Sequence, residues 1–107
     1  MSRLVVQKAL VGAALDALDW FVEYGPATTL DYADDVGINH SAAAKRVLDL
    51  KRADLVREQG KRGLRGFVIV PTSRGLSFHR LVLQERRLRR ELSAIRRQAA
   101  GLVGEAA

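Results

Sequence analysis

The fold is decided by residues 28–53, which read TTLDYADDVGINHSAAAKRVLDLKRA. Thr28 or Thr29 can cap a short helix, because the side-chain oxygen accepts a hydrogen bond from an otherwise unpaired amide of the first turn. Gly37 suits the left-handed position that ends a helix, and Asn39 is well placed to cap the next one. The apolar residues that follow recur on one helical face: Ala43, Val47 and Leu50. Two helices joined by a tight turn that contains glycine form a helix-turn-helix.

A longer helix is predicted before this motif. Its apolar residues fall on one stripe at helical spacing: Leu4, Val11, Leu15, Leu18 and Val22. We place this helix at residues 4–24, because Pro26 disfavours helical geometry in the residue before it. A short strand around residues 27–29 is an optional member of the sheet described next.

A β-hairpin is predicted after the motif. Residues 55–59 form its first strand, and the β-branched run at residues 67–70 forms its second. The connection at residues 60–66 reads GKRGLRG, with three glycines and three basic residues. This composition predicts a flexible tip that carries positive charge.

A long helix is predicted to close the chain, from Ser73 to about Ala100. Its apolar residues repeat in heptads, with Glu85 as the exception at a seam position. The predicted fold is therefore mostly α with a small β-wing. It is a winged helix-turn-helix of order α-α-α-β-β-α with a long C-terminal dimerisation helix. The residues expected to face a second copy are Leu4, Val11, Leu18, Leu81, Leu88, Leu92 and Ile95.

Charge is distributed unevenly along the 107 residues, whose net charge is +6. Residues 1–37 hold two basic and six acidic residues, whereas residues 38–107 hold sixteen basic and six acidic residues. Such asymmetry favours a surface that binds a polyanion. The alternative is a solubilising surface charge, and the arginines of the last helix are open to the same two interpretations.

Several function classes are excluded by what the sequence lacks. No phosphate-binding loop, nucleophile elbow or dinucleotide fingerprint occurs, so we expect no enzyme and no cofactor. The chain has no cysteine, and its two histidines fall on different predicted elements, so we expect no metal site. No targeting segment and no long uncharged run is visible, which predicts a cytoplasmic protein without a membrane partner.

The second helix of the motif is the candidate DNA-contacting element, because its N-terminal end must enter the major groove. Its outward residues there are small or polar, and the hairpin tip adds cations that suit phosphates or a minor groove. The candidate DNA-binding residues are Asn39, His40, Ser41, Ala42, Ala44, Lys45, Arg46, Lys61, Arg62 and Arg65.

Three stretches together resemble the winged helix-turn-helix of MarR-type and ArsR-type regulators. They are residues 30–47, the junction at residues 53–57, and residues 67–75, which contain a threonine-x-x-glycine opening of the last helix. The resemblance implies a dimer that binds a pseudo-palindromic duplex, usually as a repressor. The chain departs from the pattern in being short, in having Asp54 at the junction glycine, and in having Ala42 where the family usually has threonine.

The sequence thus predicts a single domain over residues 1–107. Residues 28–71 form its DNA-binding core and wing, and residues 4–24 and 73–102 form flanking dimerisation helices. The predicted function is sequence-specific binding of double-stranded DNA by a homodimer, most simply for transcriptional repression. The alternatives are a plasmid or phage adaptor for partition or replication, a protein-interaction module, and an RNA-binding protein. The aromatic residues near Trp20 and Phe78 belong either to an ordinary core or to a pocket for a small-molecule effector.

Overall fold

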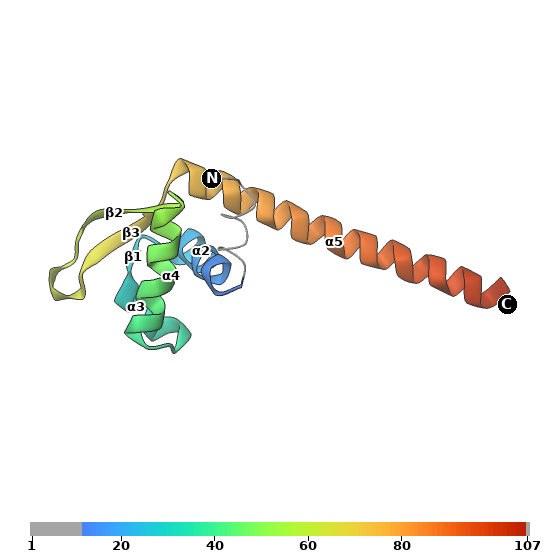
Figure 1. Ribbon diagram of the computed structural model, residues 1–107, viewed down its shortest axis with the longest axis horizontal. Helices are drawn as coiled ribbons and strands as arrows, with labels where there is room; N and C mark the ends of the chain where they lie inside the picture. The colour runs from blue at the N-terminus through green and yellow to red at the C-terminus, as the bar shows by residue number, and fades with distance from the viewer. Residues whose placement is uncertain (1–11, 107) are drawn as a thin grey trace.

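The computed structural model describes residues 12–106 of the chain. Its elements follow in the order α2 (Ala13–Tyr24), β1 (Ala27–Thr28), α3 (Thr29–Val36), α4 (His40–Arg52), β2 (Val56–Lys61), a 3₁₀ turn (Gly63–Arg65), β3 (Phe67–Pro71) and α5 (Ser73–Ala106). The helices α2, α3 and α4 and the sheet form a lobe, from which the β2–β3 hairpin and α5 project in opposite directions (Figure 1). The predicted winged helix-turn-helix with a long C-terminal helix is therefore confirmed.

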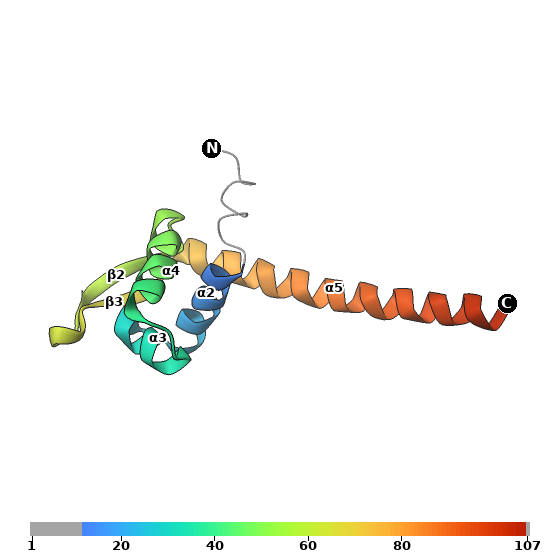
Figure 2. The same cartoon turned by 60° about the horizontal axis from the view of Figure 1, so that its bottom comes forward.

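The sheet is antiparallel, with strand order β1-β3-β2. The optional strand is present, since Ala27 pairs with Ile69 and Thr28 with Val68. The helices cover the sheet, and the buried side chains between them form one cluster that includes Leu18, Phe21, Tyr32, Leu50, Leu55 and Ile69. Figure 2 shows α2 and α3 packed beside α4 at the base of the hairpin.

The first helix differs from its prediction. Helix α2 begins at Ala13, because Gly12 has a φ of 72° and a ψ of −121°, which is not helical backbone. The predicted continuous helix from Leu4 is therefore wrong at Gly12, where only the apolar stripe, and no cap signal, guided the prediction. Leu4 and Val11 lie outside the described residues. Leu18 is fully buried in the core of its own chain, so it has no surface to offer a second copy.

The helix-turn-helix is held by three capping residues. Thr28 caps α3 in a reciprocal box: its side chain accepts from the Asp31 amide at 3.1 Å, and the Asp31 carboxylate accepts from the Thr28 amide at 3.0 Å. Gly37 ends α3 in the left-handed conformation, with a φ of 74°. Asn39 caps α4 by accepting from the Ala42 amide at 2.8 Å. These caps fix where α4 begins and therefore which of its residues face outward.

The junction between the lobe and α5 is closely packed. The Thr72 amide donates to the Leu55 carbonyl, and the Thr72 hydroxyl donates to the Asp54 carbonyl and accepts from the Gly75 amide. Asp54 has a φ of 59°, the left-handed conformation in which glycine carries no Cβ penalty. This conformation gives a physical reason for the glycine that the resembled family has at this position.

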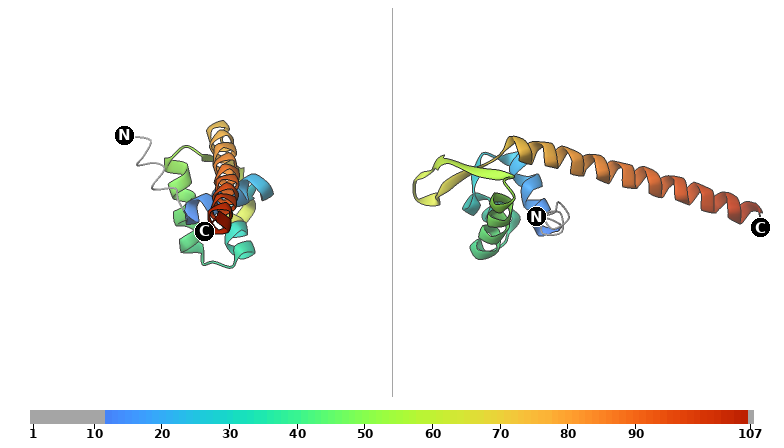
Figure 3. Two further views of the ribbon diagram at one scale, coloured as in Figure 1. Left: turned by 90° about the vertical axis from the view of Figure 1, so that its right-hand side faces the viewer. Right: turned by 45° about the horizontal axis from the view of Figure 1, so that its top comes forward.

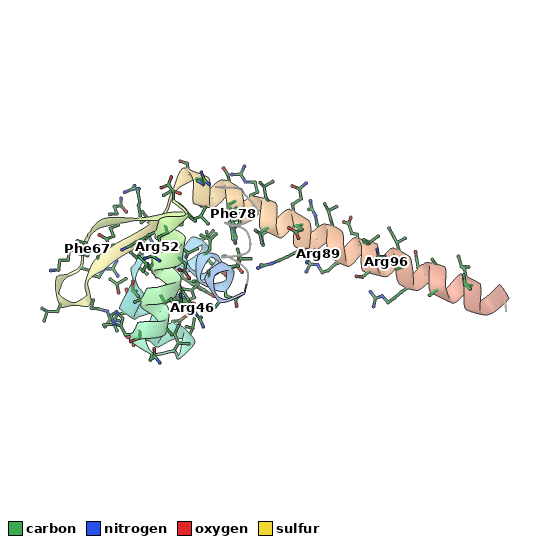
Figure 4. The ribbon with its side chains drawn as sticks, in the orientation of Figure 1. Arg46, Arg52, Phe67, Phe78, Arg89 and Arg96 are labelled. Carbon is green, nitrogen blue, oxygen red and sulfur yellow. The ribbon has the colours of Figure 1, made fainter. Side chains whose placement is uncertain are left out.

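Helix α5 extends well beyond the lobe. Its 34 residues correspond to a length of about 51 Å, and the described chain measures 67 × 33 × 20 Å. Phe78, near its start, packs against the lobe core (Figure 4), whereas the later turns project freely, as the end-on and tilted views of Figure 3 show. Among residues 12–106, no helix combines the length and apolar character that a membrane crossing requires.

Candidate nucleic-acid interface

The outer face of α4 is open and carries small or polar side chains at its N-terminal end. His40, Ser41, Ala44 and Lys45 are exposed, and Ala42 is half-buried. The inner face buries Ala43, Val47 and Leu50, as their spacing predicted. The cap residue Asn39 is also exposed, although its side-chain oxygen is used by the Ala42 amide. A duplex that approached this end of the helix would therefore contact small or polar side chains only.

Lys45 is the most accessible cation on this face. Its side chain is 79% exposed, and its nearest carboxylate, that of Asp49 one turn later, lies 3.9 Å away. An exposed pair at this distance is worth only a few tenths of a kcal/mol, so it leaves Lys45 available to another anion. Lys51, by contrast, is engaged by Glu58 of β2. Lys45 thus keeps an exposed charge in the N-terminal half of α4, whereas Lys51, near the C-terminal end, is paired with the wing, and Arg52 beside it is exposed.

Arg46 has a different environment from the one its sequence position suggested. It is half-buried, and its Nη1 donates a hydrogen bond of 2.9 Å to the hydroxyl of Tyr32 on α3. Tyr32 is buried against Trp20 and Phe21, so its hydroxyl needs an internal partner. Arg46 therefore joins α4 to α3, and this contact sets how the two helices of the motif lie against each other. Figure 4 labels Arg46 in the middle of α4 and Arg52 at the C-terminal end of the helix.

The wing is formed by β2 and β3. Val56 pairs with Pro71, Glu58 with Ile69 and Lys61 with Phe67, and the register shifts between Glu58 and Lys61. This irregularity coincides with Gly60, which has a φ of 142°. The Lys61 amine lies 6.0 Å from the centre of the Phe67 ring. Strand β2 extends two residues beyond its predicted end, so the connection is shorter and more ordered than the sequence suggested.

The wing arginines contact acidic residues of α3. Arg65 donates from Nε to Asp31 at 2.7 Å and from Nη2 to Asp34 at 2.8 Å, and Arg62 donates to Asp31 at 3.4 Å. The Thr28 amide holds the pKa of the Asp31 carboxyl below its usual value; partial burial opposes this shift, and Arg65 adds to it. Asp34 and then Asp31 raise the pKa of the Arg65 guanidinium. We name this group of Asp31, Asp34, Arg62 and Arg65 the wing clamp.

The wing clamp engages two of the predicted tip cations, Arg62 and Arg65, in ion pairs within the protein. Arg65 uses two of its donor groups inside the protein, which connects the wing to α3, and 42% of its side chain remains exposed. Arg62 makes a longer contact and has a side chain that is more exposed than that of Arg65. Lys61 remains exposed at the base of the tip. Sequence reasoning missed Asp31 and Asp34 as partners of the wing arginines.

A second polar group joins α2 to α5. Asp19 accepts from Arg86 at 3.0 Å and lies 2.7 Å from the His79 ring nitrogen. Nearby, the Trp20 indole donates to Asp35 at 2.6 Å and its ring contacts Phe21 and Tyr24. Phe21 belongs to the ordinary core, as one of the two interpretations expected. Among residues 12–106, no group of three His, Cys, Asp or Glu side chains is placed to hold a metal ion.

Comparison with known proteins places the fold in the MarR-like winged-helix group. No protein-family model matches the chain, and no curated protein matches it in sequence. Among solved structures, it is similar to a MarR protein from Peptoclostridium difficile (TM-score 0.68, 16% identity, 81% of this chain and 57% of that one). It is also similar to Staphylococcus aureus MarR in complex with salicylate and kanamycin (TM-score 0.69, 18% identity, 84% of this chain and 65% of that one).

A third similar structure contains DNA. It is the Staphylococcus aureus MepR–DNA complex, with a TM-score of 0.63 and 15% identity over 84% of this chain and 73% of that one. The present chain spans less than two thirds of the length of the first two structures. At these identities the similarity establishes the fold, and the fold is that of MarR-type transcription regulators.

Proposed function

We propose that this chain is a homodimeric, sequence-specific double-stranded DNA-binding protein that represses transcription and has no enzymatic activity. The observation that carries the proposal is the open N-terminal face of α4, where the side chains of His40, Ser41, Ala44 and Lys45 are exposed. A helix with small and polar residues at this end fits the major groove and leaves donors for base edges. A neighbour with the same fold was crystallised with DNA, which supports this use of the surface.

Each part of the interface has a separate task in this proposal. The N-terminal half of α4 contacts base edges. Asn39 and Ala42 determine where this helix begins, through the hydrogen bond from the Ala42 amide to the Asn39 side chain. Lys61 and Arg62 contact phosphates that flank this site, because exposed cations on a hairpin follow the backbone of DNA. Arg46 and Arg65 act indirectly, by holding α4 against α3 and the wing against α3. We propose residues 28–71 as the DNA-binding core and wing of a single domain.

Dimerisation is proposed from the exposed seam of α5. Leu81, Leu88, Leu92 and Ile95 fall on one helical stripe, and each is between 46% and 63% exposed. Soluble monomers rarely expose a continuous apolar stripe of this size, and a second copy of α5 would cover it. A dimer also supplies two recognition helices for half-sites about 34 Å apart, or one turn of DNA.

The first experiment is selection of bound sequences from a random duplex pool, followed by affinity measurements on the recovered site. The proposal predicts a pseudo-palindromic site whose half-sites are about one turn apart. A reporter gene placed behind this site should lose expression when the protein is present. Absence of duplex binding at physiological salt would instead favour a protein-interaction module. Protection of a long tandem array would favour an adaptor in partition or replication.

A matched pair of variants tests the division of tasks along α4. Lys45→Ala and Arg52→Ala each remove one cation from the same helix, at opposite ends. We expect Lys45→Ala to weaken binding to the selected site by about 1–3 kcal/mol and to weaken binding to random duplex by less. Arg52→Ala should change both affinities by a similar, small factor. Equal effects of the two variants on selected and random duplex would contradict the role given to the N-terminal face of α4.

A further inference from the structure

The wing carries a large apolar side chain that is fully exposed. Leu64 lies in the middle of the 3₁₀ turn, and its relative exposure is 106%, so nothing in the described chain covers it. The other side chains of the tip, between Gly60 and Gly66, are those of Lys61, Arg62 and Arg65.

The turn geometry explains why the leucine points outward. The 3₁₀ turn spans Gly63–Arg65, and Arg62 precedes it with a non-helical backbone, at a φ of −107° and a ψ of 77°. Arg62 and Arg65 are three apart, and both face Asp31. Their alignment toward α3 leaves Leu64 on a different side of the turn. The Arg65 amide donates to the Arg62 carbonyl, and the Arg62 amide donates to the Gly66 carbonyl, so the turn is closed by its own backbone.

Two glycines, Gly63 and Gly66, lie beside Leu64 in the tip. Gly63 and Gly66 have φ values of 53° and 101°, and a Cβ added at either would meet no atom within 4 Å. The backbone at Gly63 and Gly66 is therefore open to a ligand, and the side chains between these two glycines are those of Leu64 and Arg65. The minor groove of B-DNA is about 6 Å wide, and its phosphate walls attract the flanking cations.

We propose that Leu64 is an apolar wedge that enters the minor groove beside the site contacted by α4, partly unstacks one base step and bends the duplex. Apolar side chains that enter the minor groove bend DNA in this way, by about 20–90°. The wing clamp holds the turn in place while the leucine enters. Leu64 would thereby add sequence preference, because flexible pyrimidine–purine steps are the least costly to open. This inference rests on the proposed DNA-binding function.

The test measures affinity and bend together on the selected duplex. Fluorescence anisotropy gives the affinity, and energy transfer between dyes at the two duplex ends gives the bend. We expect Leu64→Ala to lose most of the bend and to weaken binding about tenfold, because the buried aliphatic contact is lost. Leu83→Ala is the matched control, since it makes the same change at an exposed leucine of α5 outside the seam. It should leave bend and affinity unchanged.

A second variant separates a wedge from a charge effect. Leu64→Lys adds a cation to the tip, so a purely electrostatic tip would bind more tightly, with a salt slope steeper by about 0.9 and the bend retained. A wedge predicts that this variant loses the bend. If wild-type protein binds and bends the duplex and both Leu64 variants bend it equally, the wedge is wrong while the proposed function stands. If wild-type protein binds no duplex, the proposed function itself fails.

Discussion

Gly75 lies at the point where α5 leaves the lobe, and the space beside it is closed. A Cβ added there would lie 1.9 Å from the Leu55 carbonyl oxygen and 2.9 Å from the Leu55 carbonyl carbon. Ordinary contact begins at 3.4 Å, so Leu55 or the start of α5 would have to move by roughly 1.5 Å. Neither can move freely, because Leu55 is buried and its carbonyl accepts from the Thr72 amide at 3.0 Å.

The expected cost of Gly75→Ala follows from these contacts. Forced displacement in a packed region costs about 3 kcal/mol, and loss of the Thr72–Leu55 hydrogen bond adds about 1 kcal/mol. The higher helix propensity of alanine offsets up to about 1 kcal/mol of this loss in stability. The net loss in the free energy of unfolding is therefore about 3 kcal/mol, which corresponds to a fall in Tm of roughly 15 °C for a chain of this size.

Thermal unfolding followed by circular dichroism measures this prediction. Gly101→Ala is the matched control, because Gly101 lies in the same helix with no atom within 4 Å of the added Cβ. We expect this control to leave Tm unchanged or to raise it slightly through helix propensity. Equal Tm values for the two variants would show that the junction is not packed as described, and the direction of α5 would then lose its support.

Three further predictions concern the wing clamp, the helix contact and the seam. Because the pKa of Asp31 is lowered in the folded chain, its ionised form stabilises the fold at neutral pH. This stabilisation is lost as the pH falls below about 4, where the carboxylate becomes protonated. The difference in urea-unfolding free energy between wild type and Asp31→Asn should therefore shrink from pH 7 to pH 3. Tyr32→Phe removes the acceptor for Arg46 and should cost about 0.5–1.5 kcal/mol in the same assay, whereas no loss would show that the contact does not form. Leu92→Glu should give a monomeric mass by light scattering, while Arg90→Glu, on the opposite face of α5, should keep the mass of a dimer.

The helix-turn-helix could be predicted because its signals are local. Thr28, Gly37 and Asn39 each act within three or four residues, through a cap or a left-handed turn, and the structure confirms all three. The exposed N-terminal face of α4 followed from the same spacing. The first helix shows where this reasoning fails: an apolar stripe continued across Gly12 without any sign of the non-helical backbone found there.

The wing clamp could not be predicted from local signals. Arg65 lies 31 and 34 residues from Asp34 and Asp31, and only the fold brings them together. Both arginines were assigned to a nucleic-acid partner, and no local pattern placed Asp31 or Asp34 near them. The contact of Arg46 with Tyr32 was missed for the same reason. Pairing opposite charges between the first helix of the motif and the wing is the signal that would have found the clamp.

The placement of DNA against the N-terminal half of α4 is tested most directly by backbone amide chemical shifts recorded while the selected duplex is added. Residues 39–45 and the wing tip should show the largest changes, and residues 96–104 of α5 should show the smallest. The opposite pattern, with changes confined to α5 and none in α4, would contradict the proposal that this helix enters the major groove.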